Sequence, residues 1–247
     1  MIKPRLEVCL SPALLYLYDT KDAVVVIIDI FRASSTITAA LDNGAECVIP
    51  VASVGECIEL GKSIKNSITA GERDGKVAEG LQHGNSPLEY PKSFIEGKTL
   101  ILTTTNGTRL LYMVKDAAEI IIGSFLNLDV ACEYLAKCGH NVLLACASWK
   151  DRFNLEDTLF AGAVVHKLEG KFDINCDSAR AAKHLFMATA GKGHLIEFLK
   201  DSSHYKRLAK FGLEHDMEYC VTPNLHPVVP VLKDKKLVKD GLSDQKA

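Results

Sequence analysis

The chain has 247 residues, of which 47% are hydrophobic and 24% charged, with a formal net charge of −2. This balance is that of a folded globular protein, and the near-neutral charge argues against binding nucleic acid or an acidic membrane surface. No apolar run approaches the roughly 18 residues of a membrane span. The eight cysteines include no C-x-x-C pair, which excludes the usual structural zinc and thioredoxin-like sites and favours reduced thiols in a cytoplasmic protein.

Strand-like and helix-like segments alternate over the first 170 residues. Apolar runs predict strands at 23–29, 47–51, 68–72, 99–105, 119–125 and 141–147. Helices are expected between them at 34–41, 54–65, 109–114, 127–138 and 155–168. Strands joined by helices of this length predict a three-layer α/β fold with a mainly parallel or mixed sheet and helices on both faces.

The last third of the chain has a different pattern. Helices are expected at 177–191 and 195–212, the second broken near 201–203, followed by short strands at 219–221 and 228–232. The charged tail after Lys233 is expected to be frayed. No linker divides the chain, so residues 1–247 are predicted to form a single domain.

The first strong functional signal follows the strand at 23–29. Asp29 and Arg32 precede the hydroxyls of Ser34 and Ser35, where a strand becomes a helix. In open parallel sheets ligands bind at the carboxyl ends of the strands. Asp29 could ligate a hard cation, and Arg32 could hold a phosphate or carboxylate. Helix capping is the alternative explanation for Asp29 or Ser34.

Two further strand ends carry similar chemistry. Glu72 and Arg73 close the strand at 68–72, and the loop that follows contains Asn85 and Ser86. The strand at 99–105 runs into hydroxyls, an amide and a glycine at the start of a helix, which together could cradle an anion: Thr104, Thr105, Asn106, Gly107 and Thr108. This stretch is not a Walker loop, and threonines are also ordinary strand residues.

The strand at 141–147 offers two competing mechanisms. Glu156 and Asp157 start the next helix, where acids are favoured by the helix dipole or could complete a metal site. Cys146 and Arg152 have the C-x5-R spacing of cysteine-dependent phosphatases. The intervening loop has no glycine and contains Trp149, which is poor for wrapping a phosphate, so a buried inert thiol is the preferred interpretation.

These loops together resemble the 2-phosphosulfolactate phosphatase family of coenzyme M biosynthesis. The resemblance rests on an ordered set of stretches: VVVIIDIFRASSTITAAL at 24–41, AGER at 70–73, GNSP at 84–87, TTTNGTRLL at 103–111, FNLEDTLFAG at 153–162, DSAR at 177–180 and HYKRLAKFGLEHD at 204–216. It implies an α/β fold of its own type and magnesium-dependent hydrolysis of 2-phospho-3-sulfolactate to 3-sulfolactate and phosphate. Family members often have Ala-Gly where this chain has Ala147-Ser148.

The sequence therefore predicts a magnesium-dependent phosphatase acting on a small, highly anionic phosphate ester. Mg²⁺ is expected on Asp29, Glu72 and Asp157, with Glu156 as a further catalytic carboxylate. Arg32, Arg73 and the loop at 104–108 are expected to hold anionic groups, with Lys150 and Arg152 in reserve. A phosphoryl-transfer enzyme or mutase, and a non-catalytic sensor of phosphorylated metabolites, remain alternatives. A homodimer is expected only from the general frequency of twofold assemblies.

Overall fold

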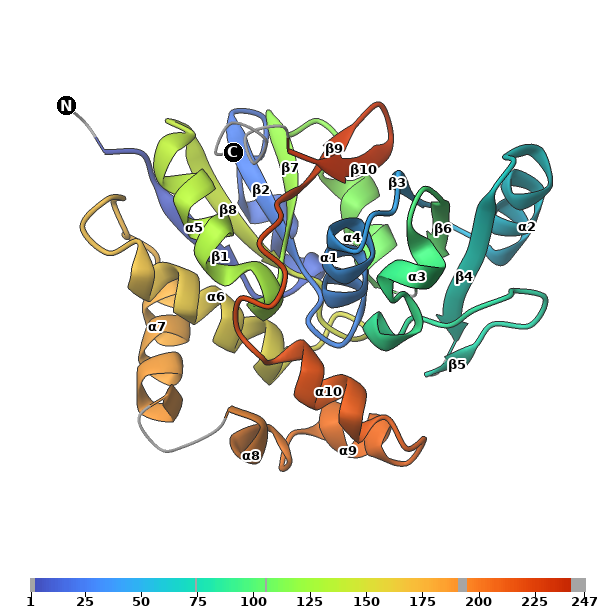
Figure 1. Cartoon of the computed structure of the whole chain (residues 1–247). Coiled ribbons are helices and arrows are strands. Elements are labelled where there is room, and N and C mark those ends of the chain that lie inside the picture. The colour runs from blue at the N-terminus through green and yellow to red at the C-terminus, as the bar shows by residue number, and fades with distance from the viewer. Residues whose placement is uncertain (1–2, 74, 105, 191–194, 241–247) are drawn as a thin grey trace.

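The computed structural model describes residues 3–73, 75–104, 106–190 and 195–240 (Figure 1). Its strands are β1 (Leu6–Cys9), β2 (Ala23–Ile28), β3 (Cys47–Pro50), β4 (Ser67–Arg73), β5 (Lys76–Val77), β6 (Thr99–Thr103), β7 (Glu119–Gly123), β8 (Asn141–Cys146), β9 (Pro230–Lys233) and β10 (Lys236–Lys239). Its α-helices are α1 (Ala33–Asp42), α2 (Val54–Ser63), α3 (Lys92–Ile95), α4 (Gly107–Met113), α5 (Leu128–Lys137), α6 (Leu155–Lys167), α7 (Asp177–Ala190), α8 (Leu195–Leu199), α9 (Ser203–Ala209) and α10 (Glu214–Cys220). Short 3₁₀ helices span Pro12–Leu17 (η1), Pro87–Glu89 (η2) and Phe125–Asn127 (η3).

The strands form one mixed sheet in the order β1-β8-β2-β7-β9-β10-β3-β6-β4-β5. Two groups within it are parallel, β1-β8-β2-β7 and β3-β6-β4. The C-terminal hairpin β9–β10 lies between them, joined to β7 by the pair Ile121↔Val231 and to β3 by the pair Leu237↔Val48. The α/β fold with a mainly parallel sheet is therefore confirmed.

Strand β2 shows why the sheet needs helices on both faces. All of its residues are buried, and their side chains alternate between two hydrophobic clusters. One cluster includes Val24 and Val26 and is covered by α5, α6, α7, α9 and α10. The other includes Val25 and Ile27 and is covered by α1, α3 and α4. A continuous apolar run is what a strand buried on both faces requires.

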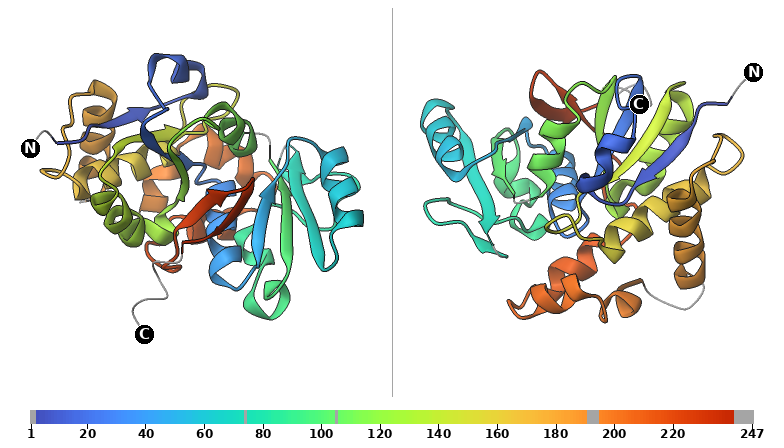
Figure 2. Two further views of the ribbon diagram at one scale, coloured as in Figure 1. Left: turned by 90° about the horizontal axis from the view of Figure 1, so that it is seen from above. Right: turned by 180° about the vertical axis from the view of Figure 1, so that it is seen from behind.

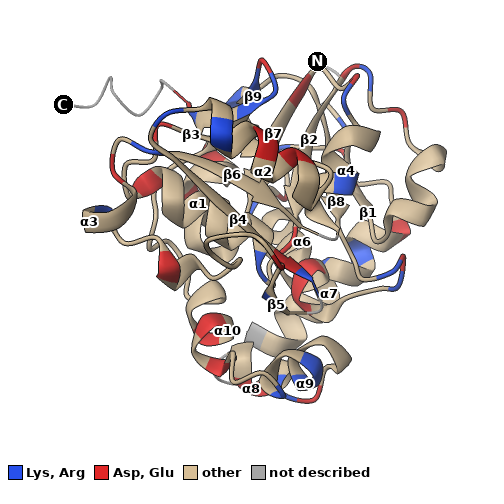
Figure 3. Ribbon diagram, turned by 90° about the vertical axis from the view of Figure 1, so that its right-hand side faces the viewer, with Lys and Arg blue, Asp and Glu red and all other residues tan. Residues whose placement is uncertain are grey.

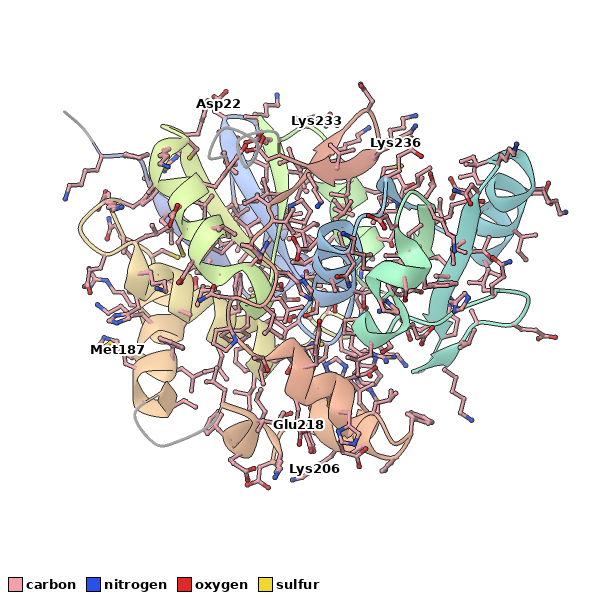
Figure 4. All side chains as sticks on the ribbon, in the orientation of Figure 1. Asp22, Met187, Lys206, Glu218, Lys233 and Lys236 are labelled. Atoms are coloured by element: carbon pink, nitrogen blue, oxygen red, sulfur yellow. The ribbon has the colours of Figure 1, made fainter. Side chains whose placement is uncertain are left out.

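The C-terminal helices lie across one edge of this sheet. In Figure 4, Asp22 marks the start of β2 at one edge of the molecule, and Lys206 of α9 and Glu218 of α10 lie at the opposite edge. The view from behind agrees that α8, α9 and α10 lie below the strands (Figure 2). These helices therefore face the carboxyl end of β2. None of the described helices has the length and apolar character needed to cross a membrane.

Two sequence-based expectations in the last third are wrong. Residues 219–221 do not form a strand, because α10 runs to Cys220 and buries Met217 and Cys220 at helical spacing. Residues 234–240 are not frayed, because β10 pairs with β9 and buries Leu237, and the rest of the expected frayed tail, 241–247, lies outside the described residues. Short apolar runs do not distinguish helix from strand, and the lysines flanking Leu237 concealed the second strand.

Candidate active site

The junction between β2 and α1 is held by its own hydroxyls. The backbone N–H of Asp29 donates to Ser34 Oγ (2.8 Å), and Ser34 Oγ in turn donates to the carbonyl of Ile27 (3.2 Å). Ser35 Oγ donates to the carbonyl of Ile30 (3.0 Å). Both serine side chains are buried, and both turn the strand into the helix. Neither contributes to the wall of the polar cavity described next.

A polar cavity of about 60 Å³ opens at the carboxyl ends of β2, β4, β6 and β8. Seven residues expected to be functional line it: Asp29, Arg32, Glu72, Asn85, Thr104, Asn106 and Lys150. The rest of the wall comes from Phe31, Gly75, Trp149, His204, Arg207 and Leu208. Loops that are distant in the sequence thus meet at one edge of the sheet.

Gly107 packs closely against the Asp29 carboxylate. A Cβ atom placed on Gly107 would lie 3.0 Å from Asp29 Oδ2 and 3.4 Å from Thr104 Oγ1. Beside it, Thr104 and Thr108 exchange hydrogen bonds between their hydroxyls and backbone amides at 3.3 Å. Thr108 therefore orders the turn from behind, while Thr104 faces the cavity. Thr105, which was also expected to bind substrate, lies outside the described residues.

Two other expected residues support the cavity indirectly. Arg73 donates to the carbonyl of Glu72 (2.6 Å) and to Thr103 Oγ1 (3.3 Å), which ties the end of β4 to β6. Ser86 Oγ donates to Asp216 Oδ1 (2.9 Å). Asp216 also forms a buried ion pair with Arg32, which joins α10 to the start of α1. The Arg32 guanidinium thus has a carboxylate partner within the chain itself.

Glu156 and Asp157 lie fully buried at the first turn of α6. The Asp157 carboxylate accepts backbone N–H groups of Ile30 (2.9 Å) and Ser148 (3.2 Å), one on each oxygen. Glu156 Oε1 lies 2.5 Å from His204 Nδ1, whereas its Oε2 is buried with no hydrogen-bond partner among the described residues. Asp157 therefore binds the loops that carry Ile30 and Ser148, and Glu156 holds His204.

Buried carboxyl groups accumulate beneath the cavity. Burial raises the pKa of Asp29 to about 6, opposed by the charge of His204 and reinforced by Glu72 and Glu156. Burial likewise raises the pKa of Asp157 well above its usual range, and the charges of Glu156 and Asp29 add to this effect. Mutual repulsion of this kind is typical of sites that bind a cation or handle protons.

The donors in the cavity fit a hard cation. Among residues 3–73, 75–104, 106–190 and 195–240, no three His, Cys, Asp or Glu side chains are grouped closely enough to hold a metal by themselves. Mg²⁺, however, is usually bound by one or two carboxylates together with water and substrate phosphate. Asp29 and Glu72 offer such carboxylates at the cavity wall, and the unpartnered Oδ1 of Asn85 is a further oxygen there.

Cys146 is not placed for nucleophilic catalysis. Its side chain is completely buried at the end of β8, outside the cavity wall, and burial raises the pKa of its thiol well above the usual range. A thiol of this kind stays protonated and unreactive. The structure therefore favours the interpretation of Cys146 as a core residue.

The sequence did not reveal four residues that complete the site. His204 and Arg207 come from α9, Asp216 from α10, and Trp149 from the loop after β8. Figure 3 shows basic residues on α9 beside acidic residues on α10 at this edge of the molecule. The stretch at 204–216 belongs to the family resemblance, but nothing in its spacing indicates which of its residues point toward the sheet.

Comparisons with known proteins identify the family of this chain. Residues 9–235 match the sequence model of the 2-phosphosulpholactate phosphatase family. A protein of Thermotoga maritima named probable 2-phosphosulfolactate phosphatase is 45% identical over 207 residues, covering 84% of this chain and 88% of its own. Proteins of the same name from Caldanaerobacter subterraneus subsp. tengcongensis and Clostridium perfringens are 39% and 36% identical, covering 87% and 90% of this chain and 90% and 92% of their own. The resemblance noted in the sequence is confirmed, and the chain belongs to the 2-phosphosulfolactate phosphatase family.

Proposed function

We propose that this chain is a magnesium-dependent phosphatase that hydrolyses 2-phospho-3-sulfolactate, or a closely related phosphorylated hydroxy acid, to the free acid and phosphate. The observation that carries the proposal is the buried Asp29 carboxylate, which faces a polar cavity built from four strand ends. Hydroxyl and amide groups there suit phosphate oxygens, and the adjoining carboxylates suit a divalent cation.

Asp29 and Glu72 are the proposed ligands of Mg²⁺. Bound Mg²⁺ would draw negative charge from the phosphate oxygens. Thr104 and Asn106 donate hydrogen bonds to those oxygens from the start of α4. Asp157 keeps its two backbone contacts and fixes the loops on either side. Asp29 and Glu72 thus face the ligand, whereas Glu156 and Asp157 hold the surrounding residues in place.

His204 is the proposed proton donor to the leaving group. Its Nδ1 is engaged by Glu156, so Nε2 is the ring nitrogen that remains for the ligand in the cavity it lines. Water attacks phosphorus and gives a proton to one of the two cavity carboxylates, Asp29 or Glu72. As the bond between phosphorus and the ester oxygen breaks, that oxygen takes the Nε2 proton and leaves as a hydroxyl.

The enzyme is proposed to work in the cytoplasm as one domain. All eight cysteines are free thiols, which suits a reducing compartment.

Phosphate release from a panel of phosphorylated hydroxy acids tests the proposal. With Mg²⁺ present we expect turnover of 2-phospho-3-sulfolactate, and with EDTA its loss and its return when Mg²⁺ is added back. Turnover that persists in EDTA would contradict the role of the metal. Tight binding without phosphate release would contradict hydrolysis itself.

A further inference from the structure

Two cations meet on one indole ring at the cavity wall. The guanidinium carbon of Arg207 lies 3.8 Å from the centre of the Trp149 ring, and Lys150 Nζ lies 4.7 Å from it. All three side chains line the same cavity as Asp29. Stacking engages the face of a guanidinium group, whereas its N–H donors lie in the plane and point outward. The ring thus fixes the positions of two cationic side chains.

The loop that presents Trp149 and Lys150 is a tight turn of unusual backbone conformation. Trp149 and Arg152 exchange both backbone hydrogen bonds at 3.0 Å, and the two residues between them have φ values of 51° (Lys150) and 60° (Asp151). Glycine or asparagine would adopt such a turn at lower cost. Left-handed residues of other types persist where their surroundings hold them, often at ligand clamps.

Neighbouring elements hold this turn in place. Ser11 Oγ donates to the carbonyl of Asp151 (2.8 Å), and Arg109 Nη1 donates to Asp151 Oδ1 (2.9 Å). Asp151 is therefore anchored from η1 and from α4, while Lys150 on the same turn forms no ion pair with any described carboxylate. The turn therefore holds Lys150 and Trp149 at the cavity in a strained backbone conformation.

The order of strands separates these cations from the proposed phosphate site. In the sheet, β8 lies on one side of β2, and β6 and β4 lie toward its other side. Asp29 at the end of β2 stands between the loop after β8 and the turn at Thr104 and Asn106. A ligand whose phosphate is at Asp29 and Thr104 would extend its remaining groups toward Trp149. Arg32 is paired with Asp216, whereas Lys150 and Arg207 are the cationic side chains of the wall that contact Trp149.

We infer that Trp149, Lys150 and Arg207 form a subsite for the carboxylate or sulfonate group of the substrate, which selects phosphorylated hydroxy acids over phosphate esters that lack a second anion. The inference rests on the proposed function and specifies its substrate class. Arg207 binds the anion through its in-plane donors, Trp149 fixes the orientation of that plane, and Lys150 adds charge at the open side.

Steady-state kinetics of Arg207→Gln test the subsite. We expect KM for 2-phospho-3-sulfolactate to rise about 10- to 100-fold, the loss of one charged hydrogen-bond partner, with kcat within about threefold. KM for p-nitrophenyl phosphate, which has no second anion, should stay unchanged. Equal changes in KM for both substrates, or no change in KM for either, would overturn the proposed subsite.

Matched variants control for charge and folding. Lys206→Gln removes a cation from the same helix at an exposed position near Asp201 and should leave all KM values unchanged. Lys150→Gln should change KM in the same direction as Arg207→Gln but less, because its side chain is exposed. Melting temperatures within a few degrees of the wild type show that each variant is folded.

Two substrate analogues distinguish the anions. 2-Phospholactate carries only the carboxylate, and the phosphate ester of 2-hydroxyethanesulfonate carries only the sulfonate. The analogue whose KM responds to Arg207→Gln identifies the group that the subsite binds, and a response from neither contradicts it. Calorimetric binding of 3-sulfolactate, which has no phosphate, separates this question from hydrolysis: wild-type binding that Arg207→Gln weakens at least tenfold supports the subsite even if no ester is turned over, and unaltered binding refutes it.

Discussion

Two cavities at opposite ends of the parallel strands differ in size and in chemistry. The larger, about 550 Å³, lies where β7 and β8 begin and is lined by α5 and the C-terminal segment, including Val130, Tyr134, Cys138 and Val229. The smaller, about 60 Å³, lies where β2, β4, β6 and β8 end. Acids line both cavities, Glu119, Glu133 and Asp240 in the larger and Asp29 and Glu72 in the smaller. The wall of the larger cavity is mainly apolar, whereas the smaller one combines its two carboxylates with several cationic, amide and hydroxyl side chains.

This difference indicates that the position of a cavity in the fold is a better guide to function than its volume. At the carboxyl ends of parallel strands, successive loops leave the sheet together and can each contribute a polar side chain. At the amino ends near β7 and β8, the loops arrive from helices and bring apolar side chains of α5. The smaller cavity is therefore the proposed binding site of this protein.

Asp29→Asn should have the largest effect on activity. The amide keeps the size of the side chain but removes the charge proposed to hold the metal, so kcat/KM should fall about 10²- to 10⁴-fold. Phosphate release at saturating Mg²⁺ measures it, with circular dichroism to confirm the fold. Turnover near that of the wild type would exclude Asp29 as a ligand and would weaken the case for the smaller cavity.

Arg32→Leu should be the most destabilising change. It leaves the buried Asp216 carboxylate without its cation, and breaking one side of a buried pair costs about 3–5 kcal/mol. Urea unfolding measures the loss. The double variant Arg32→Leu/Asp216→Leu should recover much of it, and simple additivity of the two single changes would show that the pair is not coupled.

The raised pKa of Asp29 predicts a pH-dependent cost to stability. The folded chain keeps this proton up to a pH of about 6, whereas the unfolded chain releases it near 3.8, so ionisation favours unfolding. In EDTA, the free energy of unfolding of Asp29→Asn should match that of the wild type below pH 3.8. Above pH 6, the free energy of unfolding of Asp29→Asn should exceed that of the wild type by about 3 kcal/mol. A constant difference across this range would contradict the assigned pKa.

Much of this arrangement could be predicted from the sequence because it depends on local signals. The continuous β-branched run at 23–29 identified a strand buried on both faces, and Asp29 was expected at its end. Parallel strands bring their carboxyl ends to a shared edge, which placed Glu72, Asn85, Thr104 and Asn106 near one another. Neither inference needed information about distant contacts.

The remaining features depend on contacts between distant parts of the chain. Arg32 and Asp216 are 184 residues apart, and His204 and Glu156 are 48 apart, so no spacing rule connects them. The hydroxyls of Ser34 and Ser35 resemble ligand donors in the sequence, yet backbone carbonyls take them up once the turn forms. The pattern of residues therefore did not reveal contacts between distant residues, nor the hydrogen bonds that polar side chains make to their own loop backbone.

Cys146→Ala should have little effect, although the residue ends a strand at the functional edge. Its buried thiol lies outside the cavity wall, so kcat/KM should stay within about twofold of the wild type, while the lost core volume lowers stability by about 1 kcal/mol. Phosphate release and thermal unfolding together measure this. Complete inactivation of a folded variant would revive the thiolate mechanism.

Val130→Phe probes the larger cavity and should have the smallest effect of all. Val130 is half-buried on α5 at the wall of that cavity, whose volume accommodates a phenyl ring without displacing the strands. Filling apolar space in this way should change the free energy of unfolding by less than about 1 kcal/mol. The kcat/KM for 2-phospho-3-sulfolactate should stay within about twofold, because the catalytic groups lie at the other end of the strands. A folded Val130→Phe variant that loses more than tenfold in kcat/KM would show that the larger cavity takes part in function and would reverse the comparison between the two.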